Sequence, residues 1–180
     1  MQQVVRNVRI IGTGSYVPEK IITNKYLESI VDTNDEWIQN ILGIKERRVA
    51  AANQATSDLA SKAGAKAIEN AKLKVDDIDL IIVATSTPDR LCPSTACIVQ
   101  DKLKAYDAVA FDIAAVCSGF FYGMSVASQY ISSGVYSNIL VIGADVFSKI
   151  TDWTKRDCVF FGDGAGAAVL SHANENEGFL

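Results

Sequence analysis

The sequence predicts an α/β fold in which a mixed, mostly parallel sheet is covered by helices. Between residues 56 and 145, short apolar runs typical of strands alternate with amphipathic segments typical of helices. The run LIIVA at 80–84 is unbroken, as expected of a strand with both faces covered. A hydrophobic fraction of 49% and only three prolines among 180 residues fit a single compact domain.

The first part of the chain is expected to form one strand and three helices. The strand covers residues 4–11 and ends in a glycine-bearing turn. Two short helices follow at 23–30 and 33–43, each opening with a Thr-Asn pair suited to an N-cap, and a glycine suits the end of the second. A longer amphipathic helix is expected over 56–71, capped by its first threonine and serine.

The rest of the chain alternates between strands and helices. The expected elements are a strand at 80–85, a helix at 93–103, a strand at 108–113, a helix at 118–134 and a strand at 138–145. The last stretch, residues 158–171, is expected to form a closing hairpin that turns at Gly-Asp-Gly-Ala-Gly. Because ligands of such sheets bind at the carboxyl ends of the strands, functional residues are expected there.

Composition argues against several classes of function. Seventeen basic and twenty-one acidic residues give a net charge of −4, and no basic run offers a footprint for nucleic acid. No export signal opens the chain and no apolar stretch approaches the roughly 20 residues of a membrane span, so we expect a cytoplasmic protein. The four cysteines form no C-x-x-C pair and there is one histidine, so we expect neither a metal site nor disulfides.

The segment FDIAAVCSGFFYG at 111–123 contains the main candidate for catalysis, Cys117. A free cysteine is commonly a small, buried apolar residue, and composition alone favours that interpretation. Position favours a nucleophile, because Cys117 follows a strand and opens a helix, where unpaired N–H groups and the helix dipole stabilise a thiolate. Ser118 and Gly119 would let an acyl group approach the sulfur. From position alone both interpretations stay open.

The glycine cluster at 162–166, followed by Ala167, matches the dinucleotide pattern G-x-G-x-x-A. We reject dinucleotide binding because the following AAVL continues as a strand, whereas the pattern has to open a helix. The glycines are instead expected to make a tight turn near a site. Neither a P-loop motif nor a serine-hydrolase motif is present.

Five other side chains have an ordinary interpretation beside a functional one. Trp37 is either a surface ring that covers apolar neighbours or a platform for a ligand. Arg156 is by default a solvated loop charge, and Asp112 and Asp163 are by default turn or capping acids. His172 lies in a polar tail and is a poor candidate for a catalytic base.

Seven motifs occur in the order and spacing of one known family. They are IIGTGSYVPEKIITN, DTNDEWI, GIKERR, LIIVATST, CPSTAC, AFDIAAVCSGF and FGDGAGAAVL, and they are spread along nearly the whole chain, from residue 10 to residue 170. On these motifs the sequence resembles the amino-terminal half of a β-ketoacyl-acyl-carrier-protein synthase III, one of the thiolase-like condensing enzymes. The resemblance implies that residues 1–180 form an amino-terminal, thiolase-like half-domain of a duplicated fold, without its carboxy-terminal half.

The resemblance also implies an activity. Cys117 aligns with the nucleophile that takes an acyl group from acyl-coenzyme A as a thioester, with its own N–H in the oxyanion hole. Malonyl-acyl carrier protein then loses carbon dioxide and its carbanion attacks the thioester, which starts a fatty acid chain. Trp37 and Arg156 align with residues that flank the adenine of coenzyme A, and Phe161 is expected to contact the substrate. Both thioesters are substrates, so no cofactor is implied, and a homodimer is expected.

Three departures limit what the resemblance implies. Ile41 stands where the family has an arginine near the coenzyme A phosphates. Cys92 stands where some members have a phenylalanine that enters the partner subunit's acyl pocket, so longer or branched primers are expected. The family's catalytic histidine and asparagine lie in the second half, so these residues alone should at best acylate themselves. The alternatives are a related condensing enzyme of polyketide, resorcinol or quinolone biosynthesis and a non-catalytic half-domain that binds a partner subunit.

Overall fold

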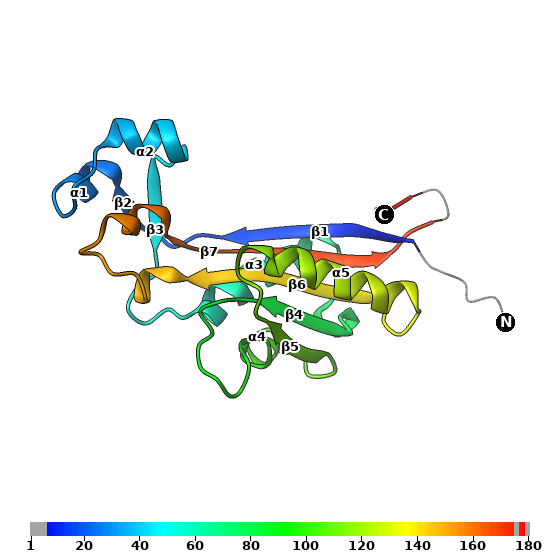
Figure 1. The fold of residues 1–180 in the computed structure, drawn as a ribbon. Helices are drawn as coiled ribbons and strands as arrows, with labels where there is room; N and C mark the ends of the chain where they lie inside the picture. The colour runs from blue at the N-terminus through cyan, green and yellow to red at the C-terminus, as the bar shows by residue number, and fades with distance from the viewer. Residues whose placement is uncertain (1–6, 175–176, 179–180) are drawn as a thin grey trace.

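The structure is a computed structural model that describes residues 7–174 and 177–178. Its centre is a five-stranded sheet with the strand order β1-β7-β6-β4-β5 (Figure 1). The strands are β1 Val8–Tyr16, β4 Leu80–Ala84, β5 Val109–Ile113, β6 Asn138–Val146 and β7 Asp163–His172. β4 is parallel to β5 and β6, whereas β7 is antiparallel to β1 and β6. All strands except β7 therefore run in one direction, which confirms the predicted mixed, mostly parallel sheet.

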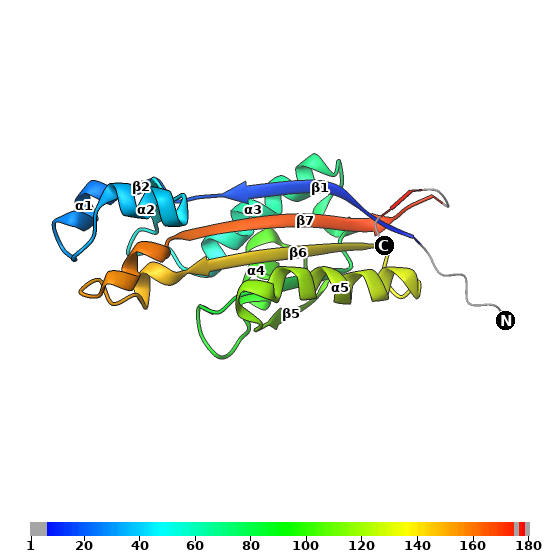
Figure 2. The same cartoon turned by 45° about the horizontal axis from the view of Figure 1, so that its top comes forward.

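Helices cover both faces of this sheet. The long helices are α3 Thr56–Asn70, α4 Thr95–Leu103 and α5 Gly119–Ser132. α3 and α4 lie on one face and α5 lies on the other (Figure 2). In β4, Ile81 and Val83 belong to the core beneath α3, and Leu80 and Ile82 belong to the core beneath α5. Every residue of β4 is buried, as its unbroken apolar run predicts.

Residues 20–49 form a small lobe at one end of the sheet. Its elements are β2 Lys20–Thr23, α1 Asn24–Glu28, α2 Asp35–Leu42 and β3 Glu46–Val49. The side chains of Thr23 and Asn34 cap α1 and α2, and Gly43 ends α2 with a φ of +71°, as the sequence predicts. The antiparallel pair β2 and β3 was not predicted, because four residues are too few for a clear alternation.

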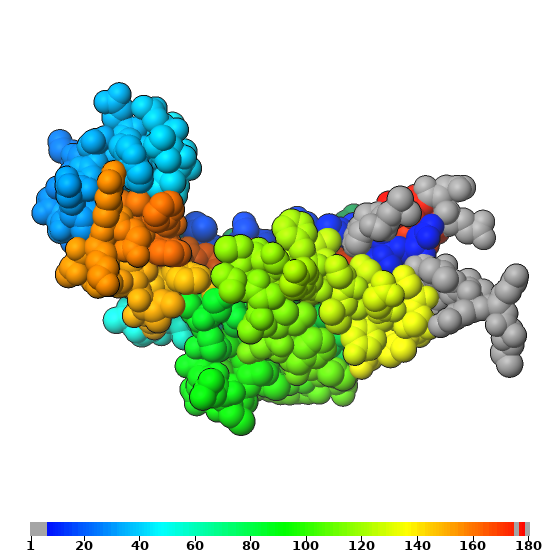
Figure 3. All heavy atoms as spheres, viewed as in Figure 1, coloured from blue at the N-terminus to red at the C-terminus, as the bar shows by residue number. Residues whose placement is uncertain are grey.

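A later part of the chain packs against the lobe. The short helical turns are η1 Val75–Asp77, η2 Val116–Ser118, η3 Phe147–Lys149 and η4 Arg156–Phe160. Cys158 and Val159 of η4 are buried in the apolar cluster of the lobe, together with Leu27 and Ile38. Figure 3 shows this segment, in orange, lying against the blue lobe. The lobe is thus held to the sheet by residues far away in the sequence.

Strand β1 continues through its glycines to Tyr16, beyond the predicted end. A Cβ atom added at Gly14 would lie 2.2 Å from the carbonyl oxygen of Ala63, and one added at Gly12 would lie 2.4 Å from that of Ala67. These two glycines therefore allow the backbone of α3 to pack directly on β1, and no turn forms at them. Residues 4–6 of the predicted strand lie outside the described residues.

The predicted closing hairpin at 158–171 is wrong. The first residues of this stretch form η4, and Gly164 and Gly166 lie inside β7. β7 pairs with β1 on one side and β6 on the other. Backbone hydrogen bonds on both edges outweigh the low strand propensity of glycine, so the chain stays extended.

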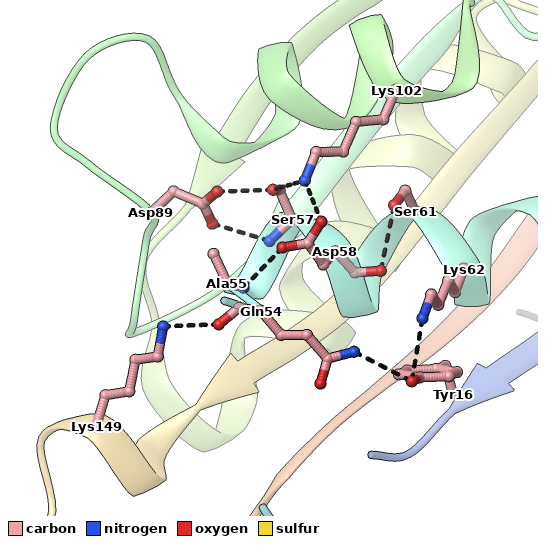
Figure 4. A network of polar contacts seen from close by, with 10 residues as sticks. All are labelled: Tyr16, Gln54, Ala55, Ser57, Asp58, Ser61, Lys62, Asp89, Lys102 and Lys149. Carbon is pink, nitrogen blue, oxygen red and sulfur yellow. Dashed lines mark hydrogen bonds and ion pairs between the residues drawn. The ribbon is translucent and has the colours of Figure 1, made fainter. Parts of the chain in front are cut away.

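Helix α3 begins with a cap that differs from the predicted one. Its N-cap residue is Ala55, whose N–H donates to Asp58 Oδ2 at 2.7 Å (Figure 4). The hydroxyl groups of Thr56 and Ser57 donate instead to the loop that follows β4, in the case of Ser57 to Asp89 at 2.6 Å. The start of α3 is therefore tied to this loop.

Replacing Asp58 by asparagine is expected to reduce stability at neutral pH but not in acid. Partial burial raises the pKa of Asp58, but hydrogen bonds from Lys102 and the Ala55 N–H outweigh burial, so the pKa lies below its ordinary value of 3.8. A lowered folded-state pKa adds stability above the unfolded-state pKa, and this stability is lost as the pH falls through the folded-state value. Urea unfolding should show a loss of about 1 kcal/mol for Asp58→Asn at pH 7 and a much smaller loss at pH 2. Equal losses at both pH values would show that the charge of Asp58 has no part.

Candidate active site

Cys117 lies in η2, between the end of β5 and the first residue of α5. The residue is exposed, so its interpretation as a buried apolar side chain is wrong. Figures 1 and 2 place the start of α5 at the end of the sheet that faces the lobe. The first N–H groups of a helix have no intrahelical partner, and together with the helix dipole they favour a negative charge nearby. Exposure and a position at a helix start are two features of the surroundings in which reactive cysteines are found.

The residue before Cys117 has a strained backbone. Val116 has a φ of +48°, which β-branched residues rarely adopt, and its side chain is exposed. Strain of this kind costs about 1–3 kcal/mol and persists only where the surrounding structure imposes it, commonly at active sites. The turn directs the chain from β5 into α5 and leaves Cys117 at the helix start. No residue type in this segment signals the strain in advance.

Gly119 packs closely against the sheet. It is buried, and a Cβ atom added to it would lie 3.1 Å from Ala84 Cβ at the end of β4. Gly123, one turn later, faces Val141 in the same way at 3.0 Å. These glycines bring α5 close to the sheet, whereas the neighbouring Ser118 is exposed. Close helix packing is therefore one reason for a glycine at this position, and its role in the approach of an acyl group stays a prediction.

Trp37 and Arg156 are in contact. The Cζ atom of Arg156 lies 4.1 Å from the centre of the Trp37 ring, a cation–π geometry. Trp37 is half-buried against the apolar cluster of the lobe, and its backbone N–H donates to the capping side chain of Asn34, at Oδ1, at 2.7 Å. Arg156 is exposed at the start of η4. The structure therefore brings together two residues that the sequence named separately.

An aromatic ligand would have to separate this pair. Carbon layers in van der Waals contact are about 3.5–4 Å apart, so a ring between the indole and the guanidinium needs a separation of about 7–8 Å. The observed 4.1 Å leaves no room for one. Because Arg156 is an exposed side chain on a long, rotatable stem, it can swing away at low cost.

Phe161 lies directly after η4 and stacks on Phe147. The ring centres are 5.0 Å apart and the planes differ by 13°. Phe147 follows the carboxyl end of β6, where ligands of α/β sheets bind, and that position could have singled it out in the sequence. The stacked rings thus connect η3 to the residue that follows η4.

Cys92 lies on a projecting loop between β4 and α4. Cys92 is exposed, and the preceding Leu91 is 98% exposed. The base of the loop is fixed, because Asp89 accepts hydrogen bonds from the N–H and the hydroxyl of Ser57 at 2.8 and 2.6 Å (Figure 4). Cys92 thus lies on the projecting part of a loop whose base is held by hydrogen bonds.

Asp112 has the predicted capping role, whereas Asp163 and His172 lie in β7 rather than in a turn or a polar tail. Asp112 accepts hydrogen bonds from the first N–H groups of α4 at 2.7 Å, which makes it a capping residue. Asp163 is buried and accepts from the N–H groups of Ala50 and Ser148. His172 is exposed at the end of β7.

The described residues contain neither a group of metal-ligating side chains nor a membrane-spanning helix. Among them, no three His, Cys, Asp or Glu side chains are grouped so that they could hold a metal ion. None of the helices within the described part of the chain is long and apolar enough to cross a membrane.

The chain is similar to proteins of one family. Residues 111–180 match the family model for 3-oxoacyl-[acyl-carrier-protein] synthase III. A β-ketoacyl-[acyl-carrier-protein] synthase III from Caldanaerobacter subterraneus subsp. tengcongensis is 58% identical over 172 residues, which are 95% of this chain and 52% of that protein. The chain therefore spans about half the length of the curated relatives it matches.

Solved structures give the same result. The 3-oxoacyl-[acyl-carrier-protein] synthase III of Aquifex aeolicus superposes with a TM-score of 0.90 at 49% identity, over 93% of this chain and 55% of that one. The priming β-ketosynthase of the R1128 polyketide pathway superposes with a TM-score of 0.91 at 32% identity, over 96% of this chain and 52% of that one. Over about half the length of these proteins, this chain is similar in sequence and in fold to the β-ketoacyl-[acyl-carrier-protein] synthase III enzymes.

Proposed function

We propose that these residues are the nucleophile-bearing part of an acyltransferase that condenses an acyl-coenzyme A primer with malonyl-acyl carrier protein and so starts fatty acid chains. The observation that carries the proposal is the exposed Cys117 at the start of α5. Its thiolate attacks the carbonyl carbon of the acyl-coenzyme A, and the N–H of Cys117 stabilises the resulting oxyanion. Collapse of this intermediate expels the coenzyme A thiolate and leaves the acyl group on the sulfur.

Trp37, Arg156 and Phe161 are proposed to bind the coenzyme A substrate. The indole of Trp37 would stack on one face of the adenine and the guanidinium of Arg156 would cover the other, once the pair has opened. Ile41, one turn after Trp37 on α2, is 64% exposed and offers no charge to the phosphates. We therefore expect stacking to contribute more than ion pairs to the binding of coenzyme A.

Fatty acid synthesis is favoured over polyketide synthesis by the comparisons. The two relatives named as synthase III enzymes are 58% and 49% identical to this chain, whereas the polyketide priming enzyme is 32% identical. For the primer, the small side chain of Cys92 supports a preference for longer or branched acyl groups, since it would leave room in the acyl pocket of a partner subunit.

We propose a homodimer that pairs along β5. This strand is at the edge of the sheet, and each of its residues is at least partly exposed, whereas all residues of β4 are buried. An unpaired edge strand is a template for a second strand. The neighbouring loop with Cys92 projects as a segment that enters a partner's site would. Sedimentation equilibrium should give twice the chain mass, and a monomer at micromolar concentration would overturn this proposal.

We also propose that a second half of the whole protein covers the outer face of α5 and supplies the histidine and asparagine of the family. Phe121 and Tyr122 on that face are 69% and 56% exposed, and Figure 3 shows α5 open on the surface. A groove of about 410 Å³ beside it is lined mainly by apolar side chains, including Ile10 and Phe120. Apolar surface of this extent commonly marks an interface. The whole enzyme would work in the cytoplasm without a cofactor.

Product analysis tests the proposed function. The protein is incubated with malonyl-acyl carrier protein and a panel of straight and branched acyl-coenzyme A primers, and acyl-protein and β-ketoacyl-acyl carrier protein are both measured by mass. We expect acyl transfer to the protein, with more of it from longer or branched primers than from acetyl-coenzyme A. Condensation should require the second half. No acyl transfer from any primer would instead support a non-catalytic half-domain.

Replacing Arg156 by alanine is expected to weaken coenzyme A binding by about tenfold, because one face of the adenine loses its cover. Calorimetric titration measures this, with 4′-phosphopantetheine, which lacks the adenine, as a second ligand of unchanged affinity. The matched control is Lys155→Ala, which removes an exposed positive charge from the next position. If both variants lower the affinity for coenzyme A equally, general charge attraction rather than stacking holds the ligand.

A further inference from the structure

A buried polar network lies beneath the Trp37–Arg156 pair and joins the two elements that carry it. We propose that Arg47, acting through Asn24, is a positioning residue that sets the geometry of this pair for its ligand. The ligand part of this inference rests on the proposed function, whereas the geometric part does not. Neither residue was singled out by the sequence.

Arg47 connects the lobe to η4. Its side chain extends from β3 and the residue is only 5% exposed. One guanidinium nitrogen, Nη2, donates to the carbonyl oxygen of Val159 in η4 at 3.1 Å. The other, Nη1, donates to the carbonyl oxygen of Ile22 at 3.2 Å and to Asn24 Oδ1 at 2.8 Å. Arg47 thus fixes η4, which begins with Arg156, against the strands of the lobe.

Asn24 connects Arg47 to both ends of α2. The residue is 1% exposed. Its Nδ2 donates to Asp35 Oδ1 in the first residue of α2 and to the carbonyl oxygen of Ile44 just beyond the end of that helix, each at 2.7 Å. Trp37 lies two residues after Asp35. The network therefore runs without interruption from the element of Arg156 to the helix of Trp37.

Packing alone does not account for a guanidinium in this place. Arg47 donates to the carbonyl oxygens of Ile22 and Val159, two members of the apolar cluster of the lobe. Its Nε has no hydrogen-bond partner among the described residues, and every acceptor that it contacts is a neutral oxygen. Burial lowers the pKa of Arg47. An apolar side chain of similar size would avoid this cost, as replacements of buried charges show. Apolar contacts are non-directional, whereas hydrogen bonds fix both distance and angle. The hydrogen bonds of the guanidinium therefore fix the position of α2 relative to η4, which an apolar side chain would not do.

The contact between Trp37 and Arg156 can be followed without any ligand. In a Trp153→Phe background Trp37 is the single tryptophan of the chain. Removing Arg156 uncovers one face of the indole, so Arg156→Ala should raise the acrylamide quenching of its fluorescence. We expect Arg47→Met to raise the quenching toward the level of Arg156→Ala. The matched control is Arg48→Met, which removes a guanidinium from the next position, where it is partly exposed and bound to Glu46.

Ligand binding provides the second measurement. Arg47→Met should lower the affinity for coenzyme A by about tenfold and leave the affinity for 4′-phosphopantetheine unchanged. Arg48→Met should change neither affinity. Asn24→Asp keeps the acceptor for Arg47 but lacks the donor toward Asp35, so it should release α2 and give the same two effects. If Arg47→Met does not fold, Asn24→Asp and Asp35→Ala, which changes a half-exposed residue, decide the matter.

The outcomes separate this inference from the proposed function. Unchanged quenching and unchanged coenzyme A affinity in folded Arg47 and Asn24 variants would overturn the positioning role, while the function would stand. Raised quenching in a protein that does not bind coenzyme A at all would overturn the coenzyme A site and leave the geometric role in place. Equal losses of affinity for coenzyme A and for 4′-phosphopantetheine would show a general loss of structure and would also overturn the inference.

Discussion

Gly14→Ala is expected to lower the free energy of unfolding by about 3 kcal/mol. The added Cβ atom would lie 2.2 Å from the carbonyl oxygen of Ala63 and 2.5 Å from the N–H nitrogen of Ala67, both in the backbone of α3. A backbone cannot rotate away as a long side chain can, so α3 has to move off β1. For a domain of this size the melting temperature should fall by roughly 10 °C.

Gly166→Ala is the matched control for this prediction. Gly166 lies on β7, beside the position in β1 that follows Gly14, and no atom lies within 4 Å of an added Cβ atom. Alanine there should be neutral or stabilising by up to about 1 kcal/mol, because glycine is the poorer strand residue. Similar losses in both variants would mean that strand propensity rather than contact with α3 explains Gly14.

Cys117→Ala is expected to abolish acyl transfer from acyl-coenzyme A, a fall in rate of about a thousandfold or more. The reason is chemical, since no other group at the start of α5 can form the thioester. Intact mass after incubation with an acyl-coenzyme A measures the loss. Cys92→Ala is the control, because Cys92 is exposed like Cys117 but lies on a loop rather than at a helix start. An acyl adduct that persists in Cys117→Ala would argue that exposure alone decides which thiol reacts.

The local patterns of the sequence predict most of the fold. The unbroken run of β4 predicts a strand with two covered faces, and the caps at Thr23, Asn34 and Gly43 predict the helices of the lobe. The predictions that are wrong concern segments whose structure is decided by pairing with distant parts of the chain. Glycines suggest turns in isolation, but those of β1 and β7 lie inside strands, because α3 packs on β1 and β7 pairs on both of its edges.

The candidate site is predictable only in part. The place of Cys117 at a strand-to-helix junction is predictable, because it depends on neighbours in the chain, whereas its exposure is known only from the structure. The contact between Trp37 and Arg156 depends on how η4 packs against the lobe, which no local pattern contains. Arg47 could have been noticed, since the alternation in Glu-Arg-Arg-Val places it on the same side of β3 as the buried Val49. Its charge argued for the surface instead, and only the structure shows its buried acceptors.

The most direct test of the nucleophile is to locate the acyl group after reaction with an acyl-coenzyme A. Trypsin separates the thiols: Cys117 falls alone in peptide 105–149, Cys92 and Cys97 share peptide 91–102, and Cys158 follows the cleavage site at Arg156. A thiol that attacks from the start of α5 predicts the added acyl mass on peptide 105–149. An acyl mass confined to peptide 91–102, or a fully free thiol at Cys117 in protein that has turned over acyl-coenzyme A, would contradict it.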